Sequence, residues 1–188
     1  MKVWHFLAVL VASATPASAE PLLRINTSYY YIEGASALVL TERMKQKGPT
    51  GVDGKPYPSR TKWDVQWRFR HNLHDGLCKL EDVAVAVGVT TIRPRWRGES
   101  KGAQSLKARW KQLNAALDRN QQFHTRQAKR AGAEIESAIL NLKPTRTCEA
   151  FTGLADDTAS KILKKYQAAS DAHNRRTEYG LKDGASLI

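Results

Sequence analysis

The chain has 188 residues, of which 41% are hydrophobic and 26% are charged, and its formal net charge at pH 7 is +12. This length is enough for one globular domain with a substantial hydrophobic core, and the sequence contains no internal repeat or low-complexity tract. The basic charge alone does not predict a nucleic-acid partner, because it serves solubility in many proteins.

The first 19 residues have the features of a secretory signal peptide. Lys2 provides a short positive region, residues 6–12 form an apolar run too short to span a bilayer, and Ala17-Ser18-Ala19 is an A-x-A cleavage signal. We therefore expect cleavage after Ala19 and a periplasmic or secreted mature domain, residues 20–188, without a transmembrane segment. There the acidic partners of a basic chain are lipid headgroups, envelope polysaccharides or extracellular DNA, and no specific nucleic-acid partner is expected.

Hydrophobic periodicity predicts strands in the first half of the chain and helices in the second. In the clearest strand, Trp63 and Trp67 alternate with polar residues and lie on one inward face. The expected elements are a strand over residues 27–34, a helix over 35–49, a Gly/Pro-rich loop over 50–59, strands over 61–69 and 78–94, a long helix over 105–142 and a last helix over 156–174. Because strands and helices are segregated, the expected class is α+β, with a small antiparallel sheet packed against one long helix and a short C-terminal helix.

The chain has two cysteines, Cys78 and Cys148. An even pair in an exported chain predicts one disulfide, with two free buried thiols as the alternative. A metal site built on these cysteines is not expected, because neither has another Cys or a His at ligand spacing nearby.

The long helix carries a polar interruption in its apolar stripe. The stripe steps by three or four residues through Trp110, Leu113 and Leu117, and Asn120 and His124 continue it without a break in spacing. Burial of an amide and an imidazole is costly unless each finds a partner, so they form either a satisfied polar cluster or a site.

The order of several short motifs resembles a bacterial family of predicted secreted zinc-dependent proteases. Members of that family have Trp pairs in a strand, a Cys-led strand, Pro-x-Trp, a long helix that leads into H-E-x-x-H, a second Cys, and an end similar to Y-D-x-x-T-x-H-G. The corresponding residues here are Trp63 and Trp67, Cys78, Pro94 and Trp96, Asn120-Gln121-Gln122-Phe123-His124, Cys148, and residues 173–180. The resemblance covers nearly the whole mature chain and implies a zincin-like scaffold.

The departures from that family fall on the residues that would perform catalysis. Asn120 stands where the family has its first zinc ligand, Gln121 where it has the general base, and Tyr179 where it has the third ligand; the Asp of the terminal motif is Asn174. A neutral amide is a poor zinc ligand, and Gln cannot accept a proton. His124 alone remains of the implied ligand set, and one imidazole cannot hold a catalytic zinc.

We therefore expect a non-catalytic, protease-like protein that binds a protein, a peptide or an acidic envelope polymer and needs no cofactor. The alternative is an active zinc metallopeptidase with unorthodox ligands drawn from its remaining histidines. The other histidines, His71, His74 and His173, are expected at the surface. The expected cleft residues are Asn120, Gln121, His124 and Tyr179.

Overall fold

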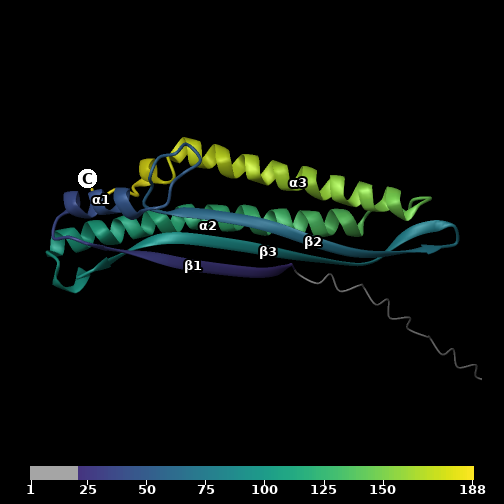
Figure 1. Cartoon of the computed structure of the whole chain (residues 1–188), viewed down its shortest axis with the longest axis horizontal. Coiled ribbons are helices and arrows are strands. Elements are labelled where there is room, and N and C mark those ends of the chain that lie inside the picture. The colour runs from purple at the N-terminus through teal and green to yellow at the C-terminus, as the bar shows by residue number, and fades with distance from the viewer. Residues whose placement is uncertain (1–20) are drawn as a thin grey trace, which may run out of the picture.

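The computed structural model describes residues 21–188, so the predicted signal peptide and its cleavage site lie outside the described residues. The expected α+β class is confirmed, with strands and helices in separate layers (Figure 1). Among the described residues, no helix is both long enough and apolar enough to cross a bilayer. The elements are β1 (Leu22–Glu33), α1 (Ala37–Lys47), β2 (Arg60–His74), β3 (Leu77–Arg97), η1 (Glu99–Lys101), α2 (Gln104–Leu140), α3 (Cys148–Thr177) and η2 (Leu181–Asp183).

The sheet is mixed, which corrects the expectation of an antiparallel one. Its strand order is β1-β3-β2, with β2 antiparallel and β1 parallel to β3. The chain reverses once through α1 and again at the β2–β3 hairpin, so β1 and β3 run in the same direction. The hairpin turn is only Asp75-Gly76, both with positive φ (54° and 74°), as a tight two-residue turn requires. The strands therefore continue through residues predicted to form a longer turn.

The helices cover one face of this sheet. The long helix α2 packs against β2 and β3, and α3 packs against α2 (Figure 1). One buried core lies between β3, the second half of α2 and α3; another joins α1, the first half of α2 and the C-terminal segment that ends at Leu187. Consequently α2 is the element on which both cores depend.

Two tryptophans fasten the free edge of the sheet to α3. Trp63 and Trp67 are half-buried against the first core, which confirms their predicted inward direction. Each indole Nε1 also donates a hydrogen bond to α3, from Trp63 to Ser170 Oγ (3.1 Å) and from Trp67 to Asp156 Oδ1 (2.9 Å). These bonds fix how far α3 stands from β2.

The C-terminal helix is not short. It begins at Cys148, where the Thr147 side chain accepts a hydrogen bond from the Ala150 N–H as the N-cap, and it continues to Thr177 over 30 residues. The predicted helix began only at residue 156, so residues 148–155, which include Gly153, were wrongly left outside it. That glycine lies on the exposed side of α3, where a missing side chain costs little packing.

The predicted disulfide is confirmed. Cys78 at the start of β3 is bonded to Cys148 at the start of α3, 70 residues later. It joins the sheet to the helix at the hairpin end of the molecule (Figure 1).

Replacing both cysteines, as in Cys78→Ser with Cys148→Ser, should lower the free energy of unfolding by about 4 kcal/mol, because a loop of this length is released in the unfolded chain. Urea denaturation of the oxidised wild type and the double variant measures this. Equal midpoints would show that the bond does not constrain the unfolded state.

Candidate functional site

The polar interruption of α2 is buried. Asn120 is 5% exposed and His124 is 1% exposed, and both lie on the stripe that carries the apolar residues of the two cores. The sequence-based expectation that this face turns an amide and an imidazole inward is therefore confirmed.

Both side chains find their partners on α3. The Nε2 atom of His124 lies 2.9 Å from Oδ1 of Asn174, and the Nε2 atom of His173 lies 2.9 Å from Oδ1 of Asn120. Each helix thus places one imidazole against an amide oxygen of the other helix. We call these four residues the amide–imidazole cluster.

The protonation of His173 follows from its neighbours. A guanidinium can only donate, so Nδ1 of His173 accepts from Arg176 Nη2 at 3.1 Å and the ring proton is on Nε2. That proton is donated to Asn120. The ring is also stacked on Phe123, with 3.8 Å between centroids. His173 was expected at the surface, but it is 7% exposed and held on three sides.

His124 is a neutral imidazole with one unused nitrogen. Burial, and next the nearby His173, lower its pKa from 6.5 to about 4. Its Nε2–H is donated to Asn174, whose amide oxygen can only accept. Within residues 21–188, the buried Nδ1 atom has no hydrogen-bond partner. The pKa of His173 is also lowered, first by burial and then by Arg176.

A cavity of about 300 Å³ lies beside the cluster, between the edge strand β2 and α3. We call it the β2–α3 cleft. Its walls include residues 60–63 of β2 and Ser170, Asp171 and Asn174 of α3, and His124 also lines it. The cleft therefore combines an imidazole and an amide with exposed charges of both signs, Lys62 and Asp171.

Tyr179, in the segment that follows α3, lies near Asn120 and His124 of α2. It lines the cleft with His124, and the next residue, Gly180, passes against Asn120. The Tyr179 hydroxyl accepts a hydrogen bond from the Val52 N–H (3.0 Å), and its ring packs on Tyr57 with centroids 4.0 Å apart. The fold thus brings together positions 120, 124 and 179.

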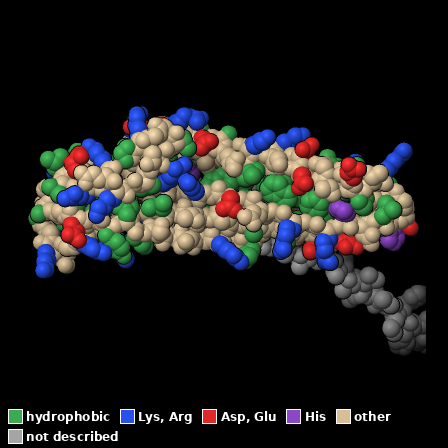
Figure 2. Space-filling model, in the orientation of Figure 1, with side chains coloured by type: hydrophobic (Ala, Val, Ile, Leu, Met, Phe, Trp, Pro, Cys, Tyr) green, Lys and Arg blue, Asp and Glu red, His purple; other side chains and the backbone are tan. Residues whose placement is uncertain are grey.

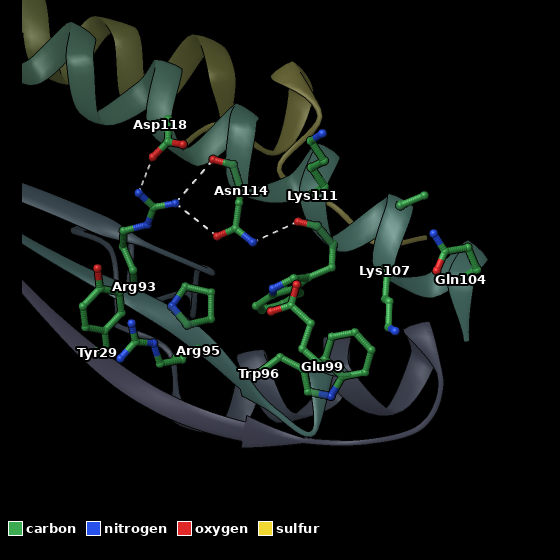
Figure 3. A pocket seen from close by; sticks show the side chains of 13 residues that line it. Tyr29, Arg93, Arg95, Trp96, Glu99, Gln104, Lys107, Lys111, Asn114 and Asp118 are labelled. Carbon is green, nitrogen blue, oxygen red and sulfur yellow. Dashed lines mark hydrogen bonds and ion pairs between the residues drawn. The ribbon is translucent and has the colours of Figure 1, made fainter. Parts of the chain in front are cut away.

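Of the four expected cleft residues, His124 and Tyr179 line the β2–α3 cleft, whereas Asn120 and Gln121 do not. Asn120 lies behind the cleft in the amide–imidazole cluster, and Gln121 points elsewhere. The Oε1 atom of Gln121 lies 3.4 Å from Nη1 of Arg93. Arg93 also donates to Asp118 and to the Asn114 side chain (Figure 3). Neighbouring helix positions point about 100° apart, which explains why Gln121 faces away from the side of α2 that carries Asn120 and His124.

A second cavity, of about 650 Å³, lies between the end of β3 and the start of α2 (Figure 3). Three of its basic side chains are already engaged: Arg93 is bound to Asp118, Arg95 lies over the Tyr29 ring, and Lys107 donates to the Ser100 carbonyl. Two carboxylates, Glu99 and Asp118, also line the space. On the face visible in Figure 2, Lys and Arg side chains are spread out with acidic ones between them. Charge therefore does not single out this cavity.

Zinc, which the protease resemblance implies, does not fit the residues of the cleft. Position 120 offers an amide oxygen already bound to His173, position 179 a phenol bound to the Val52 N–H, and position 124 one imidazole. Catalytic zinc sites use about three imidazole, thiolate or carboxylate ligands. In the described part of the chain, the one group of three potential ligands brought within reach of a metal is His71, Cys78 and Cys148, outside the cleft.

Sequence reasoning missed the α3 half of the site. His173 and Asn174 were noted as part of a terminal motif, but their contact with α2 was not foreseen. A signal was present, since Ala159, Ser170, His173 and Thr177 are buried and occur at helical spacings. The same argument that placed His124 inside would have placed His173 there. The other two histidines differ: His74 is exposed, whereas His71 is half-buried against Phe151.

Comparison with known proteins identifies a family. Residues 27–180 match the family model described as a bacterial protein of unknown function (DUF922). The chain belongs to this family. The match spans the sheet, α2, α3 and the cleft of the DUF922 domain, and the family description states no activity. Neither the curated proteins nor the solved structures contain a match.

The neutral, buried His124 predicts that the DUF922 domain is sensitive to acid. Because its pKa is 6.5 when unfolded and about 4 when folded, the unfolded state binds more protons between these values. The free energy of unfolding should therefore fall as the pH drops from about 6.5 to about 4, by up to about 3 kcal/mol from this group. Urea denaturation at several pH values measures the slope.

His124→Gln is the diagnostic variant, because Gln can still donate to Asn174 and does not titrate. It should lose this part of the pH dependence, whereas His74→Gln, at an exposed position, should keep it. An unchanged slope in His124→Gln would contradict the assignment.

Proposed function

We propose that this DUF922 chain is an exported, non-catalytic binding protein on a metallopeptidase-like scaffold, and that it holds an extended ligand in the β2–α3 cleft. The observation that carries the proposal is the cluster itself. Both Nε2 atoms that could face a metal are hydrogen-bonded to amide oxygens, from His124 to Asn174 and from His173 to Asn120. The two Nε2–H donors of the cluster are therefore paired with amide oxygens, and within residues 21–188 the His124 Nδ1 atom is the one ring nitrogen of the cluster without a partner.

The changes from the protease pattern support a coordinated loss of metal chemistry. In the resembled family, positions 120 and 124 are both His, and positions 173 and 174 are Tyr and Asp. Here the replaced residue at 120 is bound to the replaced residue at 173, and the replaced residue at 174 is bound to His124. Gln121, at the general-base position, is beside Arg93 and cannot accept a proton. The substitutions therefore complement each other across the α2–α3 interface.

The cleft retains features that suit a peptide or a protein segment. Strand β2 is an edge strand, since its one sheet partner among the described residues is β3, and an edge strand is the kind of element to which an extended peptide can add. Asp171 on α3 and Lys62 on β2 provide opposite charges on the two walls. An extended peptide would lie between them, over His124. An acidic envelope polymer is the other ligand class and would depend mainly on the basic residues.

Export follows from the signal-peptide features of the first 19 residues and is compatible with the disulfide. We propose a periplasmic or secreted location after cleavage following Ala19.

A cofactor is not required for the proposed binding. The contrasting function is an active zinc metallopeptidase with unorthodox ligands, for which a cation would have to displace the hydrogen bonds of the cluster.

The test uses the oxidised mature chain and a display library of random ten-residue peptides, followed by fluorescence anisotropy with labelled copies of the enriched peptides. Wild type should bind such peptides without cleaving them, and a zinc chelator should not change the affinity. Gln167→Trp, an exposed position on the cleft wall, should weaken binding at least tenfold by filling the cleft.

Lys161→Trp is the matched control, because this exposed residue of α3 is not part of the cleft wall. It should bind as wild type does. Equal binding by Gln167→Trp would place the ligand elsewhere. Chelator-sensitive cleavage would establish the metallopeptidase, and binding of an acidic polysaccharide such as alginate instead of peptides, lost at high salt, would establish the polymer ligand.

A further inference from the structure

A second group of potential ligands surrounds the disulfide. His71 of β2, Cys78 of β3 and Cys148 of α3 each offer one ligand atom, and these three atoms lie within 4.8 Å of one another. We call them the His71–disulfide cluster. It is separate from the cleft, because Cys148 and Ser170 are roughly 33 Å apart along α3 at about 1.5 Å per residue.

The imidazole in this cluster has a free lone pair. The Thr152 hydroxyl donates its one proton to the Cys148 carbonyl (2.9 Å), so His71 Nε2, 2.9 Å from Thr152 Oγ1, must donate in their bond. The ring proton is therefore on Nε2, and Nδ1 is an acceptor. Among residues 21–188, no hydrogen bond to this Nδ1 is formed. The lone pair of Nδ1 is therefore the one that a cation would use, and the contact with Thr152 would remain.

The surrounding structure would hold the two sulfurs near each other after reduction. Cys78 is fully buried, its N–H and C=O both bonded to Thr145, and Cys148 is followed by the buried Phe151. Cys148 is also the first residue of α3, where the helix dipole favours a negatively charged thiolate. Two thiolates and one imidazole form a Cys₂His ligand set, which zinc accepts with water in the fourth position.

We propose that, when the Cys78–Cys148 disulfide is reduced, these cysteines and His71 bind one zinc ion or a similar soft divalent cation. A dithiol, or a phosphine together with one water molecule, supplies the two electrons. The S–S bond breaks and each sulfur gains a proton, from the dithiol or from the water. The reductant becomes a disulfide or a phosphine oxide, whose oxygen comes from the water. Zinc then displaces the two thiol protons, which are released to solvent. The disulfide and the bound cation exclude each other, so the cation protects the thiols from reoxidation.

The test compares oxidised and phosphine-reduced mature protein under anaerobic conditions, with cobalt(II) as a spectroscopic probe and zinc measured by competition with a chromophoric chelator. The reduced wild type should bind one equivalent and show thiolate-to-cobalt charge-transfer absorption, and the oxidised protein should not. His71→Ala should weaken zinc binding at least tenfold. His74→Ala, an exposed histidine in the same strand, should bind as wild type does.

Circular dichroism monitors folding in each sample. If reduction alone unfolds the chain, one equivalent of zinc should restore the native spectrum for wild type and His74→Ala but not for His71→Ala. The proposal is overturned if the reduced chain takes up no zinc, if the cobalt complex lacks thiolate absorption, or if His71→Ala binds as tightly as wild type. None of these results depends on the β2–α3 cleft.

Discussion

Two imidazole–amide hydrogen bonds join α2 and α3 beside the β2–α3 cleft, apart from the bonds of Glu134 to Lys165 and Tyr166 farther along the same helices, and the rest of the site depends on them. His124 donates to Asn174 and His173 donates to Asn120, each over 2.9 Å between buried or half-buried groups. An unpaired amide or imidazole in such a place would cost several kcal/mol, so the two bonds select one rotation and one register of α3 on α2. That register places Ser170, Asp171 and Asn174 opposite β2 and thereby forms the cleft.

In the proposed function, the same bonds stand where the resembled metallopeptidases would have zinc. In a metal site, the cation would join ligands from the helix and the terminal segment. Here amide oxygens accept hydrogen bonds from the imidazole N–H groups. The Tyr179 hydroxyl is bonded to the loop before β2, and Gly180 passes beside Asn120. Gln121 lies next to Arg93 and does not line the cleft. What remains is a polar cleft on an edge strand, an arrangement suited to binding.

Local patterns in the sequence predicted the elements and the inward face of α2 correctly, since these follow from side-chain spacing alone. They could not give the partners, because His124 and Asn174 are 50 residues apart and their contact depends on how α3 packs. For the same reason β1 was not expected beside β3, and His71 was not expected beside the disulfide, although each lies there. The predicted start of the last helix, at residue 156, was wrong, because α3 begins at Cys148 after the N-cap Thr147 and includes the exposed Gly153.

The cleft depends on one protonation state, in which His124 and His173 are neutral, protonated on Nε2 and bonded to amides. Long-range proton–nitrogen NMR of the imidazole rings in the oxidised mature chain at pH 7 tests it directly, with and without one equivalent of zinc. We predict that both rings are the Nε2–H tautomer and that zinc leaves their nitrogen shifts unchanged. A charged ring or an Nδ1–H tautomer for His173 would contradict this protonation state. A zinc-dependent shift of His124 Nε2 would show that the cleft binds a metal ion.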